Sequence, residues 1–513
     1  MPSTSQHGPG AELEIKLALP TADPASLARQ LARLPALARR KPVRKQVDNI
    51  YFDTPAQALR AQRMALRLRR VGGDDAPQWL QTFKTSDGGD SALSLRGEWE
   101  VPVPGPALVQ AALQAALQAA PPWQRLDPEG AVFAALQPCF ATAFERTAWT
   151  VRRRDGSVIE VALDLGQITS GQRSVPICEL ELELLAGAPT ALFDLARHIA
   201  LHIAVLPLAA SKAQRGHALR DGTLDTPLRA RPQPLGGDVA WHHMVQPVLG
   251  EMFAQFTANL NALRHCDDPE LVHQARVGWR RFRSALRLFK PVAPVRAAPA
   301  WPQMQPLLVL LGELRDLDVA CTQTLPALQD AFVAGHAGRA ERWQAMEQAF
   351  QQAALQQRQR VRQALQEPPV GAALLAITLW LDELARPEAW GAQDISGKAV
   401  RRWVRQRMVR LHAQWKKALR DSTHAESQHR ARILAKRLRY NIEALCPLLP
   451  ARTQRWLQQA SGVQAGIGAS RDLLQAGVLA QRLAVDRGIV AFLRGYAAGR
   501  AGVPWASQLP GSV

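Results

Sequence analysis

The sequence of 513 residues has few of the features that mark secreted, disulfide-bonded or membrane-spanning proteins. Its five cysteines form no CxxC pair, which argues against a disulfide framework or a zinc site and favours a reducing compartment. The first ten residues are polar and lack the apolar stretch of a secretory signal. The longest apolar run, Val370 to Leu381, is too short for a bilayer and is typical of a core helix. These absences predict a cytoplasmic protein, and the length predicts two or three domains.

Acidic residues are scarce in the second part of the chain. Residues 1–225 contain 25 Lys and Arg against 23 Asp and Glu, whereas residues 226–513 contain 38 against 21. Most of the formal net charge of +19 therefore belongs to residues 226–513. Such an excess predicts a polyanionic partner for this part, with an ordinary charged surface as the alternative.

The first part contains a recurring alternation of charged and apolar residues, which begins with Glu12-Leu13-Glu14-Ile15-Lys16. Successive side chains of a strand point to opposite faces, so the charged residues share one face. A single segment of this kind would favour an ordinary strand with one solvated face. The pattern recurs with acidic and basic residues on separate segments, at 67–69, 98–100, 160–164 and 179–183. A sheet curled into a barrel, with its charged face inward, explains this sorting better.

Eight segments of this kind predict an α+β domain built on a small closed barrel with flanking helices. The predicted strands are 13–19, 43–52, 65–71, 78–85, 93–101, 142–153, 158–165 and 177–185, and the predicted helices are 23–37, 106–119 and 188–203. A stretch rich in proline and glycine at 222–238 predicts a linker, so the first domain comprises residues 10–221. Residues 239–500 are rich in Ala, Leu, Gln and Arg and predict an all-α second domain.

The helical part contains an internal repeat. The pattern H-x-x-R-x-x-x-[RK]-R-x-R begins at His273 and again at His429, an offset of 156 residues. The same offset relates Pro291 to Pro447, Gly312 to Gly468, and Arg315-Asp316 to Arg471-Asp472. This constant register predicts two copies of one helical unit, which form two pseudo-symmetric helical bundles.

The basic residues of each copy form a continuous stripe at helical spacing. The predicted polyanion-binding residues are His273, Arg276, Arg280, Arg281, Arg283, His429, Arg432, Lys436, Arg437 and Arg439. Like charges at these spacings repel, which favours a neutralising ligand over a solvated face. Arginine forks suit phosphate oxygens, whereas the two histidines either bind phosphate or pack. The stripes carry no base-stacking aromatics and no helix-turn-helix pattern. They therefore predict a polyanion that has no base sequence, and not nucleic acid.

The charged face of the predicted barrel has the composition of a site for a metal and a polyphosphate. Lys16, Arg67, Arg69, Lys84, Arg146 and Lys212 are predicted to bind phosphate oxygens. The carboxylates predicted to hold Mg²⁺ or Mn²⁺ are Glu12, Glu14, Glu98, Glu100, Asp164, Glu179 and Glu181. Glu12 and Glu14 are expected to act toward metal and water, and Lys16 toward phosphate. Phosphoryl transfer depends mainly on positioning and charge neutralisation, so the lack of a Ser/His/Asp set is no objection.

These residues resemble known families. The sequence contains E-x-E-x-K at Glu12, Glu14 and Lys16, and further motif segments at 51–55, 65–69, 83–84, 96–100, 160–164, 179–181 and 211–216. Together these segments resemble CYTH domains, the triphosphate tunnel metalloenzymes. This resemblance covers roughly residues 10–220. The H-x-x-R repeat resembles the CHAD domain, a helical domain with conserved histidines, over roughly residues 235–500.

The resemblance implies an eight-stranded antiparallel tunnel followed by two four-helix halves. It implies divalent-metal-dependent hydrolysis of inorganic triphosphate to pyrophosphate and phosphate, with Arg215 among the substrate-binding residues. It also implies binding of inorganic polyphosphate between the helical halves, no specific nucleic acid, no membrane, and a cytoplasmic location at polyphosphate granules. Class IV adenylate cyclases and thiamine triphosphatases share the tunnel motif, and a polyphosphate-binding scaffold with an idle tunnel is a further alternative.

Overall fold

The computed structural model describes residues 11–21, 23–72, 77–85, 91–116, 121–231, 233–236, 239–336, 338–391, 397–421 and 425–501. Residue 10 of the predicted first domain, residues 117–119 of a predicted helix, and Pro232, Gly237 and Asp238 of the predicted linker lie outside this set. The described residues divide into two compact units. The first lies within Met1–Thr226 and Leu365–Leu379, and the second within Pro227–Ala364 and Trp380–Val513.

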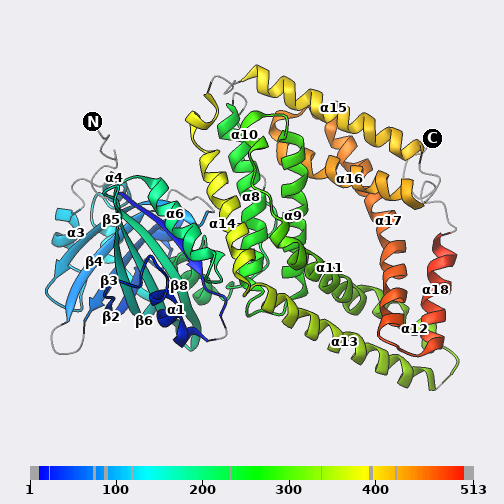
Figure 1. Cartoon of the computed structure of the whole chain (residues 1–513), viewed down its shortest axis with the longest axis horizontal. Helices are drawn as coiled ribbons and strands as arrows, with labels where there is room; N and C mark the ends of the chain where they lie inside the picture. The colour runs from blue at the N-terminus through cyan, green and yellow to red at the C-terminus, as the bar shows by residue number, and fades with distance from the viewer. Residues whose placement is uncertain are drawn as a thin grey trace. The chain divides into compact units, whose positions relative to one another are not determined.

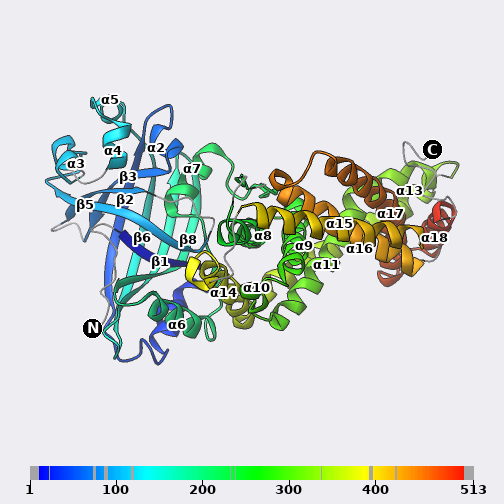
Figure 2. The ribbon, with the colours of Figure 1, turned by 90° about the horizontal axis from the view of Figure 1, so that it is seen from above.

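The first unit is a closed ring of eight antiparallel strands (Figure 1, Figure 2). The strands are β1 (Ala11–Ala18), β2 (Val43–Asp53), β3 (Met64–Val71), β4 (Gln78–Thr85), β5 (Leu93–Val103), β6 (Gln137–Arg152), β7 (Val158–Ser170) and β8 (Arg173–Ala186). They are ordered β5-β4-β3-β2-β6-β7-β8-β1, and β1 also pairs with β5 to close the ring. All eight predicted strands are confirmed. A ninth strand, β9 (Leu206–Pro207), pairs with β1 and was not predicted because two residues show no alternation.

Apolar side chains on the outer face of the ring form its core. Leu13, Ile15 and Leu17 of β1 are buried and pack with α1 (Leu27–Ala32) and α6 (Pro189–Ala200) in one cluster. Each fully buried leucine or isoleucine contributes about 1.5–3 kcal/mol relative to an exposed one. The burial of the apolar residues outside the ring therefore fixes the charged residues of the same strands inside it.

The other helices of the first unit are short. They are α2 (Ala58–Ala61), α3 (Gln110–Ala116), α4 (Pro121–Leu126), α5 (Ala131–Ala134) and α7 (Lys212–Asp221). The predicted helix 23–37 begins as a 3₁₀ turn at Pro24–Ser26, and its α-helical part ends at Ala32.

Helix α14 (Pro368–Glu383) contains the apolar run at 370–381, and its Leu375 and Leu379 join the core cluster of the first unit. The prediction of a core helix there is confirmed. Its close approach requires a glycine, because a Cβ at Gly371 would lie 2.2 Å from the carbonyl oxygen of Val205. The first unit thus includes a segment distant in sequence from the strands that it covers.

The second unit is helical, as predicted. Its helices are α8 (Trp241–Ala262), α9 (Pro269–Phe289), α10 (Ala293–Arg296), α11 (Gln305–Val319), α12 (Gln329–Val333), α13 (Gly338–Ala364), α15 (Lys398–Arg420), α16 (Ala425–Leu445), α17 (Thr453–Arg482) and α18 (Arg487–Ala501). Helix α16 begins and ends 156 residues after α9, which is the offset of the sequence repeat. The two helices pack against each other. Helix α8 packs on α9 and helix α15 packs on α16, so the preceding helix has the same place in each copy.

Part of the predicted linker is fixed to α8. The side chain of Asn259 accepts a hydrogen bond from the Leu228 amide at 3.1 Å and donates one to the Leu228 carbonyl at 3.0 Å. The Arg231 amide donates to Glu251 Oε1 at 2.7 Å. Residues 228–231 therefore follow the surface of the second unit and are not a free tether.

No described helix alone is long and apolar enough to cross a membrane. Helices α13 and α14 meet the length and composition requirement only when they are counted together across a bend.

Candidate functional site

The ring of strands encloses a cavity of about 560 Å³. The structure brings most of the predicted site residues to its wall: Glu12, Glu14, Lys16, Arg67, Arg69, Lys84, Glu98, Glu100, Arg146, Glu181 and Lys212. Asp164 and Glu179 are buried and bind lysine and arginine side chains of this wall, and Arg215 binds Glu179. The alternation of the strands gathers all of these residues except Lys212 and Arg215, which come from α7, because every second side chain of a strand points into the cavity.

Lys212 reaches the cavity from the first turn of α7. A capping box begins this helix, in which Ser211 Oγ accepts from the Gln214 amide and the Gln214 side chain accepts from the Ser211 amide. The helix lies close on β6, since a Cβ at Gly216 would lie 2.1 Å from the Phe140 ring. The segment 211–216 therefore fixes the position from which Lys212 extends.

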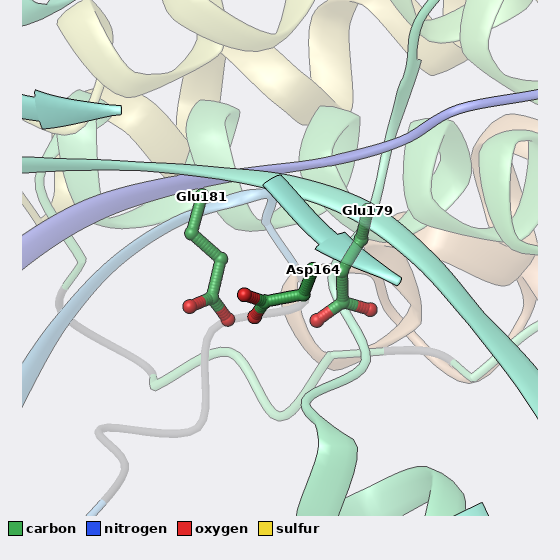
Figure 3. A group of neighbouring side chains, drawn as sticks. All are labelled: Asp164, Glu179 and Glu181. Atoms are coloured by element: carbon green, nitrogen blue, oxygen red, sulfur yellow. The ribbon is translucent and has the colours of Figure 1, made fainter. Parts of the chain in front are cut away.

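Three carboxylates surround the Lys212 ammonium group: Asp164, Glu179 and Glu181, which we call the carboxylate trio (Figure 3). One oxygen of each lies within 4.8 Å of the others. Lys212 Nζ donates to Asp164 Oδ2 at 2.7 Å and to Glu181 Oε1 at 3.0 Å, and it also pairs with Glu179. Burial disfavours a charged lysine, yet these carboxylates raise the pKa of Lys212.

Two arginines complete the charge balance of the carboxylate trio. Arg146 binds Asp164 with two bonds of 2.7 Å and reaches Glu181 Oε2 at 2.5 Å. Arg215 Nη1 donates to Glu179 Oε2 at 2.6 Å. Three carboxylates thus face three cations, so the trio needs no further positive charge.

A second acidic group in the cavity has a different charge balance. Glu14 on β1 lies opposite Glu183 on β8, which lies opposite Glu160 on β7, so the three form a line across neighbouring strands, the acidic row. Burial, together with nearby carboxylates that include Glu160 and Glu14, raises the pKa of Glu183 to about 7. Like charges directly opposite on a sheet destabilise it, so the acidic row favours a bound cation.

Glu12 and Glu98 extend this acidic region. Burial raises the pKa of Glu12 to about 8, although Lys84 Nζ lies 3.0 Å from its carboxylate. Glu98 is also buried, but Lys84 at 2.7 Å and Arg67 hold its pKa below the usual range. Glu12 and Glu98 share Lys84, Glu98 also pairs with Arg67, and Glu14 pairs with Lys16. With Glu160 and Glu183 included, the carboxylates on this side of the cavity outnumber these cations.

Arginines on the remaining strands form a basic group of Arg67, Arg69 and Arg146. Burial and the charges of Arg67 and Arg146 lower the pKa of Arg69 to about 10. Arg67 is 7% exposed, and its Nε has no hydrogen-bond partner among the described residues. Arginines held this close favour an anion between them.

Sequence reasoning did not assign Glu160 and Glu183 to the site, although both line the cavity. Each continues the alternation of its strand, so the period of two was the signal that could have found them. Tyr51, Thr82 and His217 also line the cavity and carried no such signal. Glu100, which was predicted, accepts a hydrogen bond from Thr82 Oγ1 at 2.8 Å and lies 3.5 Å from Arg69.

In the second unit, α9, α11, α16 and α17 contribute a basic surface, which comprises Arg276, Arg280, Arg315, Arg432, Lys436 and Arg471. Burial and the charge of Arg280 lower the pKa of Arg276 to about 10. Burial and the neighbouring arginine charges lower the pKa of Lys436 to about 7. Arg276 and Arg432 each have a buried Nε without a partner among the described residues. Arg315 and Arg471 belong to the sequence repeat but were not predicted as binding residues.

The two predicted histidines, His273 and His429, differ from each other in burial and in neighbouring charges. Burial and the charge of Arg315 lower the pKa of His273 to about 4, so this histidine is neutral. His429 is exposed. Their equivalent positions in the repeat therefore have unequal surroundings.

Other predicted residues of the stripes face elsewhere. Arg281 is 1% exposed and binds Glu251 at 2.8 Å and Gln255 at 2.6 Å, so it lies against α8 inside the second unit and is not available to a ligand. The prediction that Arg281 binds polyphosphate is wrong. Successive residues of a helix are about 100° apart, so the Arg281 side chain points to a different face from that of Arg280.

Arg283 and Arg437 both lie near Arg287, whereas Arg439 lies near Lys436 of the basic surface. Arg283 is exposed, and burial and the charge of Arg287 lower its pKa. Burial and the charge of Arg287 also lower the pKa of Arg437. Arg439 lies over the Tyr440 ring and 3.8 Å from Glu443. Its charge is one of those that lower the pKa of Lys436.

Comparison with known families identifies both parts. Residues 10–217 match the CYTH domain model and residues 247–481 match the CHAD domain model. The chain therefore contains a CYTH domain followed by a CHAD domain.

Individual relatives resemble parts of the chain. An inorganic triphosphatase of Haemophilus influenzae is 32% identical over 208 residues, which are 40% of this chain and 54% of that protein. The chain thus spans about half the length of this relative. The crystal structure of the CHAD domain from the plant Ricinus communis covers 54% of this chain and 91% of its own, with 31% identity and a TM-score of 0.45. A Hippeastrum protein, described as a candidate adenylyl cyclase with a dominant triphosphatase activity, covers 42% and 97%, with 21% identity and a TM-score of 0.30.

Proposed function

We propose that the first unit hydrolyses inorganic triphosphate to pyrophosphate and phosphate with a divalent cation, and that the second unit binds inorganic polyphosphate. One observation carries the first part: a single cavity holds arginines that favour an anion and carboxylates that favour a cation. Triphosphate with Mg²⁺ or Mn²⁺ satisfies both demands together. The inorganic triphosphatase of Haemophilus influenzae, which matches over 208 residues, supports the same reaction.

Glu12, Glu14, Glu98 and Glu183 are the carboxylates that we propose to hold the cation. Hard divalent cations prefer oxygen ligands, and these carboxylates form the side of the cavity on which carboxylates outnumber cations. When bound, the cation would polarise the phosphoryl group and acidify a water molecule. We assign Asp164, Glu179 and Glu181 a different task from the predicted metal ligation, because they already hold Lys212, Arg146 and Arg215 in place.

The cations of the cavity are proposed to bind the phosphate chain. Arg67, Arg69 and Arg146 neutralise oxygens that bear charge throughout the reaction, and Lys84 and Lys212 add point charges at either side. Lys16 pairs with Glu14, so it links the phosphate-binding and cation-binding groups. Their fixed positions favour catalysis because phosphoryl transfer depends on positioning and neutralisation.

The aromatic residues of the cavity support an inorganic substrate over a nucleotide. Lys212 and Arg146 lie 5.0 and 5.8 Å from the centre of the Phe144 ring, and Tyr51 stacks on Phe140 at 4.6 Å. These faces already have partners, whereas an adenine base needs a free face to stack on. The class IV cyclase reaction therefore has less support from the described wall.

A substrate panel tests the proposed hydrolysis. The full chain is incubated with triphosphate, ATP, thiamine triphosphate or long-chain polyphosphate, with Mg²⁺, with Mn²⁺ or with a chelator. We expect fastest phosphate release from triphosphate and none with the chelator. Preferred conversion of ATP to cyclic AMP would refute the proposal, and absence of any turnover would favour a binding scaffold with an idle cavity.

The raised pKa of Glu12 predicts how Mg²⁺ stabilises the protein at different pH. Its value of about 8 exceeds the ordinary 4.5 of the unfolded chain. The stabilisation that protonated Glu12 provides is complete below pH 4.5 and is lost as the pH rises through 8. Mg²⁺ binds the deprotonated form, so the increase in melting temperature that Mg²⁺ produces should be larger at pH 9 than at pH 6.

Thermal unfolding with and without Mg²⁺ measures this difference. Glu12→Gln cannot lose a proton at this position, so it should make the Mg²⁺ effect smaller and reduce its dependence on pH to the part that Glu183 supplies. Glu145→Gln removes an exposed carboxylate of β6 and serves as the matched control, which should behave as the unchanged protein. An equal Mg²⁺ effect at both pH values would contradict the assignment of Glu12.

A further inference from the structure

The basic surface of the second unit contains one amine among guanidinium groups. Lys436 occupies the position in the second copy that Arg280 occupies in the first, at the offset of 156 residues. An arginine keeps its proton in proteins, whereas a lysine can lose its proton and act as a nucleophile. The substitution between copies therefore introduces a chemical property that the rest of the surface lacks.

Arginines from three helices face Lys436. Arg432 and Arg439 lie four residues before and three residues after it on α16, so they share its side of the helix. Arg280 comes from α9 and Arg471 from α17, and both helices pack against α16. The charges that act most on Lys436 all belong to these four arginines, while Asp472 acts on Arg432 and Asp316 acts on Arg471.

This surrounding favours the neutral amine and also favours phosphate. Burial comes first and the four arginines next in lowering the pKa of Lys436 to about 7, so a large share of it is uncharged at neutral pH. Arg432 is 8% exposed, and its buried Nε has no partner among the described residues. A phosphoryl group would satisfy such donors.

We propose that Lys436 is a site of covalent acylation by acyl phosphates, the mixed anhydrides of a carboxylic acid and phosphoric acid. Arg280, Arg432 and Arg471 hold the phosphate, and the neutral Nζ attacks the neighbouring carbonyl carbon. A C–N bond forms and the C–O bond to phosphate breaks. Phosphate leaves with the electron pair of that bond and receives the proton that the amine gives up. The product is an amide that cannot take up a proton, so the surface loses a group that becomes a cation when a polyanion binds beside it.

This step uses no residue of the cavity in the first unit. It shares its arginines with the surface proposed to bind polyphosphate, so polyphosphate should compete with acyl phosphate. Acylation should in turn weaken polyphosphate binding, because one cation fewer contacts the polyanion.

Peptide mass spectrometry of the full chain, incubated with acetyl phosphate at pH 7.5, tests the proposal. The chain has only ten lysines, and the exposed Lys290, Lys398 and Lys417 of the same unit serve as internal controls. We expect Lys436 to be acetylated at least tenfold faster than these three. Arg280→Gln should slow acetylation by acetyl phosphate more than acetylation by an N-hydroxysuccinimide ester, which has no phosphate. Acetylation of Lys436 at the rate of Lys290 would overturn the proposal.

Binding measurements separate this proposal from the proposed function. Pretreatment with acetyl phosphate should reduce polyphosphate affinity about threefold or more in the unchanged protein and not in Lys436→Arg, which keeps the charge without the amine. If the protein binds polyphosphate but acetyl phosphate does not acetylate Lys436, the acylation is refuted and the proposed role of the second unit stands. Rapid acylation without any polyphosphate binding would support the acylation and refute the proposed role of the second unit.

Discussion

Replacing Glu14 with glutamine should lower triphosphate turnover by about a thousandfold while the protein stays folded. Glu14 is 2% exposed, accepts from Ser94 Oγ at 3.0 Å and pairs with Lys16. It also stands in the acidic row, opposite Glu183. Glutamine keeps the shape and the acceptor oxygen but removes the charge from the group proposed to bind the cation. The loss should therefore appear in activity far more than in stability.

Phosphate release at saturating triphosphate and Mg²⁺ measures the effect of Glu14→Gln. The exposed Glu145 gives the matched control, because Glu145→Gln removes the same charge from a strand of the same ring. Polyphosphate binding by the full chain should be unchanged in both variants. Activity above about a tenth of the original would show that Glu14 does not hold an essential cation.

The strands of the first unit could be predicted because burial outside the ring imposes a period of two on the sequence. Leu13, Ile15 and Leu17 show this directly, since all three are buried and alternate with charged residues. The packing of Leu375 and Leu379 on the same core could not be predicted. Apolar residues specify that they are buried but not which surface covers them.

The site was predictable in its membership but not in its internal pairing. Alternation indicated that the carboxylate trio would come together, and the resemblance of segment 211–216 added Lys212 to the same site. Neither indicated that the ammonium group would lie among the three carboxylates, where a metal ion was expected. Likewise, helical spacing placed Arg280 and Arg281 in one stripe, although only the structure shows the Glu251 carboxylate that binds Arg281. Pairing depends on residues far apart in sequence, which a local pattern does not contain.

The two units differ in the charges that they collect, and this difference assigns them different tasks. The cavity combines cations with an acidic side on which carboxylates outnumber the cations, which suits a substrate that arrives with a metal. The basic surface combines arginines and one lysine, and burial and like charges lower the pKa of Arg276 and Lys436. A surface of this kind attracts a polyanion, because its arginines outnumber the two aspartates beside them, Asp316 and Asp472. This difference supports the proposal that the first unit hydrolyses triphosphate and that the second unit retains a long phosphate chain.

Reversing two charges of the basic surface should weaken polyphosphate binding by about a hundredfold at 0.1 M salt. The double variant Arg280→Glu with Lys436→Glu places two carboxylates among Arg276, Arg432 and Arg471. The new carboxylates would pair with these arginines and occupy the donors that a phosphate chain needs. The slope of log affinity against log salt should also fall, because fewer counterions are released on binding.

Titration with labelled polyphosphate between about 50 and 200 mM salt measures both quantities. The matched control is Arg410→Glu with Arg420→Glu, which changes the net charge equally on the exposed face of α15. We expect the control to lose little affinity, because its arginines lie outside the basic surface. Equal losses in the two double variants would mean that polyphosphate responds to the net charge of the protein and not to the arrangement of α9, α16 and α17. Triphosphate turnover in the cavity should be unaffected by either pair, which separates chain retention from hydrolysis.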